Sequence, residues 1–319
     1  MDAFRDKVAI AIDGGGIRGT MVAKALAVLE AEKVWGDKTC PEVFHLAAGT
    51  STGSIISAGL AAKGLTGQEL YELYRGLGPK IFKRTLRSTL WFIFRYRYAH
   101  DTLKKYLEDY LGKGTTMGQV TGMDLVITAF DLKENKTLFI KTGKDKYKAW
   151  PVVEAVLASS SVPTYFPAVD NRYVDGGVGS YANPCYLAAF EACLVKKWDP
   201  NETTLISLGT GRDPHSLKPS RVKRFQAWDW LGPLLGAFLQ SADDQQVRLV
   251  KTFFEKVDFR RFQVRFTESI AMDDASPEAL EALTKYGEQL ADMIIKNQTD
   301  EEALASAYTL PTTWFRQSA

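Results

Sequence analysis

Cysteine and histidine are the scarcest residues in this chain of 319 amino acids, with three of each. Cys185 and Cys193 are eight positions apart (193 minus 185), or about 12 Å along a helix, which is too far for a disulfide bond. The chain has no C-x-x-C pair, and its histidines and cysteines never occur at the spacing of metal ligands. We therefore expect a fold without essential disulfides, in a reducing compartment, with no metal and no cofactor.

Long apolar runs are also missing. No stretch approaches the roughly 18 uninterrupted apolar residues that a membrane-spanning helix needs. The closest, residues 230–239, contains a proline and two glycines. The N-terminus carries acids at Asp2, Asp6 and Asp13 and does not have the pattern of a signal peptide. These absences predict a cytoplasmic protein whose membrane contact, expected from two stretches considered below, is peripheral, and they leave export without a cleavable signal peptide open.

Neither sign of charge is in excess. Lys and Arg number 40 and Asp and Glu number 38, so the net charge of +2 gives no reason to expect a nucleic-acid partner. Hydrophobic residues make up 45% and charged residues 24%, a globular composition that excludes disordered, collagen-like and coiled-coil chains. Without repeats or linkers, we expect one domain over residues 1–319. Its core motifs lie in residues 7–211, and residues 212–319 form a mostly helical part that includes a candidate lid.

Strand and helix patterns alternate in the first 62 residues. Residues 7–12 predict a buried strand, and residues 21–34 predict a helix that stops before Gly36. Residues 43–48 predict a second strand, and residues 52–62 a second helix. A strand, glycine turn and helix that occur twice in succession indicate an α/β fold with a parallel sheet.

The rest of the chain continues this mixed pattern. A capping box at residues 66–69 predicts the start of a helix. Further strands are expected at residues 124–132, 137–141, 173–174 and 204–208 and near 261–266, and further helices at residues 101–111, 151–159, 184–195, 242–256 and 277–296.

A G-x-S-x-G motif, Gly49-Thr50-Ser51-Thr52-Gly53, separates the second predicted strand from the second predicted helix. A serine on such a sharp turn projects its hydroxyl group, and the helix N-terminus that follows supplies amide donors and a positive partial charge. Ser51 is therefore a candidate nucleophile. The alternative is a glycine-rich turn whose serine is incidental.

The first strand-to-helix turn is richer still in glycine: Asp13-Gly14-Gly15-Gly16-Ile17-Arg18-Gly19. Backbone N–H groups of consecutive glycines can converge on an anion, which suits an oxyanion hole or a phosphate. A dinucleotide site would further need an acid at the end of the second strand, where the chain has the G-x-S-x-G motif instead. A nucleotide-binding loop and a purely structural turn remain alternatives. Arg18 could hold an anion or pair with a carboxylate in the core.

A base for the serine must come from elsewhere in the chain. Asp175-Gly176-Gly177 lies 124 residues after Ser51 (175 minus 51), and its alternative is a type I′ turn. His45 falls in the second predicted strand and His100 next to a predicted helix start. His215 follows Asp175 in a loop, so a Ser51–Asp175–His215 esterase triad stays open.

The three motifs together resemble the patatin-like phospholipase family. D-G-G-G-x-R-G, G-x-S-x-G and D-G-G occur in this order, and the likeness extends from residue 7 to residue 211. It includes Ala182-Asn183-Pro184 after the D-G-G motif and the segment S-L-G-T-G at residues 207–211. Each motif is weak alone, whereas the combination is specific.

The resemblance implies a three-layer α/β fold, with a mainly parallel central sheet and helices on both faces. It also implies a lipid acyl hydrolase that acts on a phospholipid or another acyl lipid through an acyl-enzyme. In that family a serine and an aspartate work without histidine, so Ser51 would be the nucleophile and Asp175 the base. The remaining motif residues would form the oxyanion hole (Gly14, Gly15 and Gly16, supported by Arg18) or support the motifs (Gly49, Gly53, Gly176 and Gly177).

Two stretches have the composition of a membrane contact. Residues 79–100 combine cations and aromatic residues without any acid, and residues 218–239 place basic residues before tryptophans. The alternative for both is ordinary packing of the aromatic side chains in the core. The candidate contact residues are Lys83, Arg84, Arg87, Trp91, Trp228 and Trp230.

Overall fold

The computed structural model describes residues 3–83, 96–214, 222–223, 225–226 and 231–300, and between residues 231 and 241 it describes the backbone only. Within these residues, a seven-stranded mixed sheet forms the centre of the molecule, with strand order β4-β3-β2-β1-β6-β7. β5 pairs with β3 beside this path. The strands are β1 (Lys7–Ile12), β2 (Leu46–Gly49), β3 (Asp124–Asp131), β4 (Lys136–Lys141), β5 (Tyr173–Asp175), β6 (Thr203–Leu208) and β7 (Asp258–Phe262).

Most strand pairs are parallel, as the alternating pattern predicted. β1 lies between β2 and β6, and β2–β3 and β6–β7 are also parallel pairs. Only β4 and β5 run antiparallel to their neighbour, β3. The described helices are α1 (Gly19–Ala31), α2 (Cys40–Val43), α3 (Thr52–Ala58), α4 (Gly67–Ile81), α7 (His100–Leu111), α8 (Val152–Ser159), α9 (Cys185–Phe190), α11 (Leu231–Phe253) and α12 (Pro277–Ile295).

Short single-turn segments join these elements. Two of them, η2 (Gly59–Lys63) and η6 (Glu191–Val195), are π-helical turns that extend α3 and α9. The others are 3₁₀ turns: η1 (Gly16–Arg18), η3 (Met117–Gln119), η4 (Asp145–Tyr147), η5 (Gly176–Gly179) and η7 (Pro200–Glu202).

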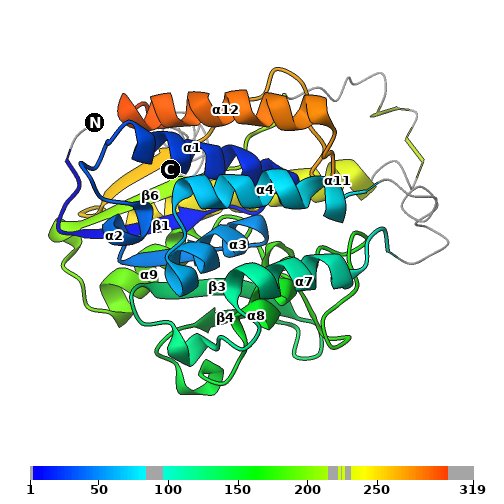
Figure 1. The fold of residues 1–319 in the computed structure, drawn as a ribbon, viewed down its shortest axis with the longest axis horizontal. Helices are drawn as coiled ribbons and strands as arrows, with labels where there is room; N and C mark the ends of the chain where they lie inside the picture. The colour runs from blue at the N-terminus through cyan, green and yellow to red at the C-terminus, as the bar shows by residue number, and fades with distance from the viewer. Residues whose placement is uncertain (1–2, 84–95, 215–221, 224, 227–230, 301–319) are drawn as a thin grey trace, which may run out of the picture.

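Alternation along β1 shows how the sheet is covered on both faces. Val8, Ile10 and Ile12 belong to a cluster with the apolar side chains of α1, α3, α4, α7, α8 and α12. Ala9 and Ala11 point to the opposite face, where they pack with residues of α9 and α11. Figure 1 shows α12, α1 and α4 side by side on the first face, and α1 contacts both neighbours. The expected three-layer fold, a mainly parallel sheet between two helical layers, is confirmed.

The part of the chain after residue 212 joins the same layers. β7 pairs with β6 in parallel, and α12 packs on α1. α11 begins at Leu231, earlier than the expected residue 242, because the apolar run continues the helix. Its Pro233 lies in the first turn, where a backbone N–H has no helical partner anyway. β7 ends at Phe262 and not at residue 266, because it pairs with β6 only as far as Leu208.

Two other boundaries differ from expectation. The second strand, expected from residue 43, begins only at Leu46, because Val43 ends α2, whose capping box joins Thr39 and Glu42. The N-cap of α7 is Ala99, and Asp101 lies in the first turn. A carboxylate in that turn still interacts favourably with the helix dipole.

Candidate active site

The register of three strands brings the two proposed catalytic residues to one place. β2 ends with Gly49 opposite Ile127 of β3, and Ser51 follows two residues later. On the same side of β3, β5 places Asp175 opposite Ala129. The two partners on β3 are two residues apart, or about 7 Å along a strand. Asp175 therefore occupies the space just beyond the end of β2, beside the turn that carries Ser51.

Ser51 has the backbone of a strained turn. Its φ of 54° and ψ of −123° are rare for a residue with a side chain, and it forms the N-cap of α3. The Ser51 N–H donates to Ser159 Oγ at 2.9 Å, and the Ser51 carbonyl accepts from the Ser54 N–H. Ser51 is 5% exposed. This is the geometry of a nucleophile elbow, in which strain presents the hydroxyl at the end of a strand.

The two glycines of the motif have no room for a side chain. A Cβ on Gly49 would lie 2.2 Å from the Gly53 carbonyl oxygen. A Cβ on Gly53 would lie 2.0 Å from the carbonyl oxygen of Ile12, the last residue of β1. Both glycines let the turn pack against itself and against β1.

Asp175 is a buried carboxyl group with one engaged oxygen. Its Oδ1 accepts from the Gly177 N–H at 2.7 Å, whereas its Oδ2 has no hydrogen-bond partner among the described residues. Burial raises the pKa of Asp175 to about 6, and the Gly177 N–H and the Ser51 side chain oppose that rise. The D-G-G motif does not form a type I′ hairpin turn, because Asp175 caps the 3₁₀ turn η5. Gly176 is required there, since a Cβ would lie 2.0 Å from Thr128 Oγ1.

The glycine loop lies against Ser51. A Cβ on Gly14 would lie 3.2 Å from Ser51 Cβ. The Gly14 N–H donates to the Ala182 carbonyl at 2.9 Å, so it is not available to a substrate. The N–H groups of Gly15 and Gly16 have no partner within the part of the chain that the structure describes. Of the three glycines predicted to bind an oxyanion, these two therefore offer open donors.

Arg18 pairs with a carboxylate, but its partner Asp213 is exposed and does not lie in the core as one alternative predicted. Its guanidinium donates to Asp213 Oδ2 at 2.6 Å and to the Ile270 carbonyl at 2.8 Å, and it lies 5.3 Å from the centre of the Phe266 ring. These bonds tie the turn after the glycine loop to two later segments.

Two of the three histidines lie in the described residues, and each is hydrogen-bonded to a group other than Ser51. His45 precedes β2, at the opposite end of that strand from Ser51, and its Nδ1 accepts from the Val8 N–H. His100 Nε2 lies 3.0 Å from Ser161 Oγ, and burial lowers the pKa of His100. His215 lies outside the described residues.

The expected membrane-contact residues are only partly described. Lys83 is exposed. Near it, Phe82 packs on Tyr98 and Phe166, with ring centres 5.4 and 6.4 Å away. Tyr98 donates to Asp273 at 3.0 Å. Phe82 and Tyr98 thus pack inward, as the alternative interpretation predicted. The other candidates, Arg84, Arg87, Trp91, Trp228 and Trp230, lie outside the described residues.

Sequence reasoning missed a buried charge network behind the glycine loop. Arg261 of β7 is fully buried and donates to both carboxylate oxygens of Asp13, at 2.9 and 2.5 Å. It also donates to Asp243 of α11, which accepts from Arg212 as well. The signal in the sequence was an arginine pair inside an apolar strand, D-F-R-R-F, because a buried arginine needs carboxylate partners.

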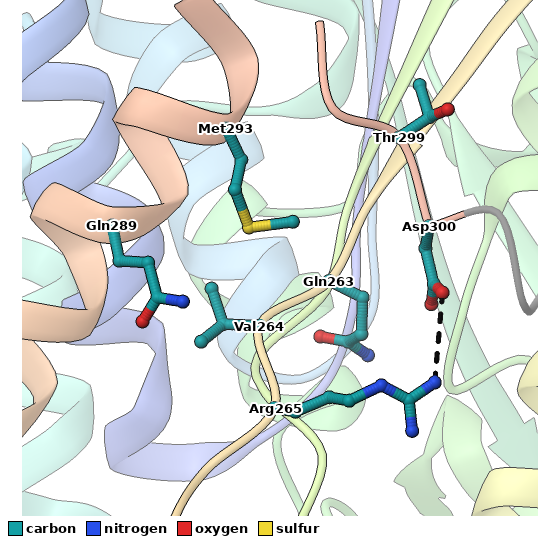
Figure 2. A pocket seen from close by; sticks show the side chains of 7 residues that line it. All are labelled: Gln263, Val264, Arg265, Gln289, Met293, Thr299 and Asp300. Atoms are coloured by element: carbon teal, nitrogen blue, oxygen red, sulfur yellow. Dashed lines mark ion pairs between the residues drawn. The ribbon is translucent and has the colours of Figure 1, made fainter. Parts of the chain in front are cut away.

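A cavity of about 280 Å³ lies elsewhere, between α12 and the segment that continues β7. Figure 2 shows its seven lining residues, with Arg265 and Asp300 facing each other at 3.9 Å. None of the candidate catalytic residues lines this cavity, so it is separate from the candidate active site.

No cluster of His, Cys, Asp or Glu suited to a metal ion occurs in the described part of the chain. Nor, within the same residues, is any helix both long and apolar enough to cross a membrane.

A serine on a strained strand-to-helix turn, beside a buried carboxyl group and open backbone donors, is typical of serine hydrolases. Comparison with known families agrees with this class of enzyme and identifies one family within it. The model of the family described as patatin-like phospholipase matches residues 10–189, more than half of the chain. This chain belongs to the patatin-like phospholipase family, and it is a hydrolase.

Curated relatives extend the match over almost the whole chain. Patatin-17 of Solanum cardiophyllum is 26% identical over 344 aligned residues, which cover 92% of this chain and 87% of the relative. The cGAMP-activated phospholipase of Vibrio cholerae is 25% identical over 96% of both chains. The crystal structure of VipD from Legionella pneumophila has a TM-score of 0.50 at 11% identity, over 92% of this chain and 67% of that one. At this identity the VipD structure supports the fold alone.

Proposed function

We propose that this protein hydrolyses carboxylic esters of phospholipids or other acyl lipids, with Ser51 as nucleophile and Asp175 as base. The observation that carries the proposal is the register of β2, β3 and β5, which sets a strained serine beside a buried carboxyl group whose Oδ2 has no hydrogen-bond partner among the described residues. Family membership and the phospholipase relatives support a lipid as substrate.

The first half of the reaction forms an acyl-enzyme. Asp175 Oδ2 accepts the Ser51 proton while the serine oxygen attacks the ester carbonyl carbon. The N–H groups of Gly15 and Gly16 donate to the negative oxygen of the tetrahedral intermediate. The carbon–oxygen bond to the leaving alcohol or lysolipid then breaks, and Asp175 returns the proton to that oxygen.

The second half releases the fatty acid. A water molecule gives a proton to Asp175 and attacks the acyl carbon, and the same two amides hold the second oxyanion. The bond to the serine oxygen breaks, and Asp175 returns the proton to Ser51. An aspartate with a pKa near 6 is a stronger base than a free carboxylate, whose pKa is about 3.9, yet it is still ionised at neutral pH.

The alternatives make different demands on the site. A Ser51–Asp175–His215 esterase would lose activity when His215 is replaced by Gln, whereas a Ser–Asp pair would not. A dinucleotide-binding loop would need an acid at the end of the second strand, where this chain has the G-x-S-x-G motif instead.

Labelling with a fluorophosphonate probe, followed by peptide mapping, tests the nucleophile. We expect the label on Ser51 and loss of both labelling and ester hydrolysis in Ser51→Ala. The matched control is Ser57→Ala on the same helix, because the buried Ser57 Oγ has no hydrogen-bond partner among the described residues. Assays with and without cGAMP are included, since one relative is a cGAMP-activated phospholipase. Full activity of Ser51→Ala would refute the proposal.

A further inference from the structure

The buried charge network contacts both loops that border Ser51. One loop begins with Asp13, which follows β1 and precedes the glycines. The other loop contains Tyr181, Ala182 and Asn183, after the D-G-G motif. The two loops are joined directly, because the Gly14 N–H donates to the Ala182 carbonyl. The second loop also reaches the nucleophile turn, since Thr50 Oγ1 donates to the Tyr181 carbonyl at 2.5 Å.

A single side chain links the far ends of the two loops. The Arg261 guanidinium donates to both oxygens of Asp13 and, at 3.0 Å, to Asp243 Oδ1. The same Asp243 oxygen accepts from Asn183 Nδ2 at 2.6 Å. The path from Asp13 through Arg261 and Asp243 to Asn183 thus closes a ring with the Gly14–Ala182 hydrogen bond. Within this ring, Asp13 can move away from Asn183 only if charge-assisted hydrogen bonds break.

Stability alone does not explain an arginine in this place. A buried ion pair is often no more stabilising than apolar residues of the same volume, because both charges lose their hydration. What Arg261 adds is geometry: its planar group holds two oxygens of Asp13 and one of Asp243 in a fixed arrangement, which a lysine cannot reproduce. A displacement of about 1 Å in a catalytic group can cost as much as a hundredfold in rate.

We propose that Arg261 is a positioning residue, which aims the Gly15 and Gly16 amides at the oxyanion by fixing the Asp13 loop relative to the Asn183 loop. The inference rests on the proposed function. Because Asp243 belongs to α11, that helix contributes to the geometry of the active site although it lies on the opposite face of the sheet from α3.

The test compares Arg261→Lys with Arg260→Lys. Arg260 is the preceding residue of β7, and its side chain is bonded to Asp258 and to the Ala3 carbonyl on the other side of the strand. For each variant, kcat and KM are measured on a short-chain nitrophenyl ester, together with Tm and the second-order rate of fluorophosphonate labelling of Ser51.

For Arg261→Lys we expect a fall of about tenfold or more in kcat and in the labelling rate, with KM within about threefold of the parent. Arg260→Lys should keep the parental kcat. A folded Arg261→Lys whose kcat and labelling rate match those of Arg260→Lys would overturn the proposal, whatever its Tm.

A second variant keeps the proposal testable if Arg261→Lys does not fold. Asp243→Asn keeps the shape of the side chain but loses the charge that faces Arg261, so we expect a drop of about three- to tenfold in kcat. An unchanged kcat in Asp243→Asn would also overturn the proposal. Ser51→Ala separates the two hypotheses: if it retains activity the proposed function fails, whereas parental kcat in folded Arg261→Lys with an inactive Ser51→Ala overturns only the positioning role.

Discussion

Ser51 and Asp175, the proposed catalytic residues, both have a local structure that costs free energy. Ser51 holds a backbone conformation that a residue with a side chain seldom adopts, and the hydrogen bond from its N–H to Ser159 Oγ helps to keep it there. Asp175 is buried with one oxygen unbonded among the described residues, an arrangement that costs free energy when the carboxyl group is ionised. A strained backbone beside a buried ionisable group in space is typical of functional sites.

The pKa of Asp175 predicts how activity depends on pH. The base must be ionised to accept the Ser51 proton, so kcat/KM should fall about tenfold per pH unit below about pH 6. The measurement is a pH–rate profile on a nitrophenyl ester, with each rate extrapolated to zero time so that unfolding does not contribute. A profile that stays flat down to pH 4.5 would show that Asp175 is not the base.

The same pKa predicts that the contribution of Asp175 to folding stability depends on pH in the opposite sense to activity. Because the pKa of Asp175 is higher in the folded chain than in the unfolded chain, protonation of Asp175 stabilises the fold. This stabilisation is complete below about pH 3.8 and is lost as the pH rises through about 6. Asp175→Asn, which keeps an oxygen for the Gly177 N–H, should therefore unfold less easily than the parent at pH 8, by up to about 3 kcal/mol. Denaturant titrations at pH 8 and pH 4 measure this gain, which should almost vanish at pH 4. A variant less stable than the parent at pH 8 would contradict the assignment of a costly buried charge.

At the scale of an element, the glycine loop packs too closely against its neighbours to accept a side chain. A Cβ on Gly15 would lie 2.3 Å from Thr210 Oγ1 and 2.6 Å from Thr210 Cβ, so Gly15→Ala must move the loop. Because we propose that its amides bind a charge that exists only in the transition state, we expect kcat to fall by about 10²–10³ and KM to change little. Steady-state kinetics on folded protein measure both constants.

The control for Gly15→Ala is Gly76→Ala in α4. A Cβ on Gly76 meets nothing within 4 Å, so this variant should keep full activity and gain up to about 1 kcal/mol in unfolding free energy. Parental kcat in folded Gly15→Ala would mean that the loop amides do not serve the transition state.

Local pattern predicted the elements well where one physical cause acts alone. Lys7–Ile12 was predicted to the residue, since a buried parallel strand needs a continuous apolar run. The Thr66 capping box correctly marked the start of α4. Pattern failed at two boundaries. β7 ends where its distant partner β6 stops pairing with it, and α11 starts earlier than predicted, at Leu231, because a local apolar run continues the helix.

The candidate site likewise has a part that local motifs predict and a part that depends on distant segments of the chain. Ser51, Asp175 and the glycines follow from motifs, because each motif is a short run of chain with its own backbone requirement. Their proximity is a property of the sheet, which sets β5 beyond the end of β2. Arg261 and Asp243 belong to no motif, since their meaning comes only from each other and from Asp13.

For the whole molecule, strand order decides where the site lies. The chain passes from β1 to β2 on one side and returns to β6 on the other side of β1. At the carboxyl ends of such a pair the connections diverge and leave a crevice, which is where ligands bind in open α/β sheets. The glycine loop follows β1, Ser51 follows β2, and Thr210 follows β6. The fold thus collects at one edge the residues that the sequence separates by more than 150 positions.

The surroundings of this edge also lead to a prediction about where the enzyme contacts a lipid bilayer. The end of α4 lies beside it, because a Cβ on Gly78 would touch Ile17, next to the glycine loop. Lys83 follows α4 and is exposed, and the basic stretch through Arg84 and Arg87 continues from it. We expect anionic bilayers to recruit the protein here, at about 1 kcal/mol per cation close to the surface, or about a hundredfold in partitioning for three cations.

Co-sedimentation of Ser51→Ala protein with vesicles measures this recruitment without hydrolysing the lipid. The comparison is with the same protein carrying Lys83→Gln, Arg84→Gln and Arg87→Gln, on anionic and zwitterionic vesicles at low and high salt. Exposed charges are screened within about 8 Å at physiological ionic strength, so high salt should remove the electrostatic part and leave only what aromatic insertion contributes. Recruitment that depends on these three cations at low salt, and that converges for the two proteins at high salt, would place the membrane at the active-site edge. Equal sedimentation of both proteins in every condition would mean that this stretch does not face lipid, and that substrate reaches Ser51 without a basic docking surface.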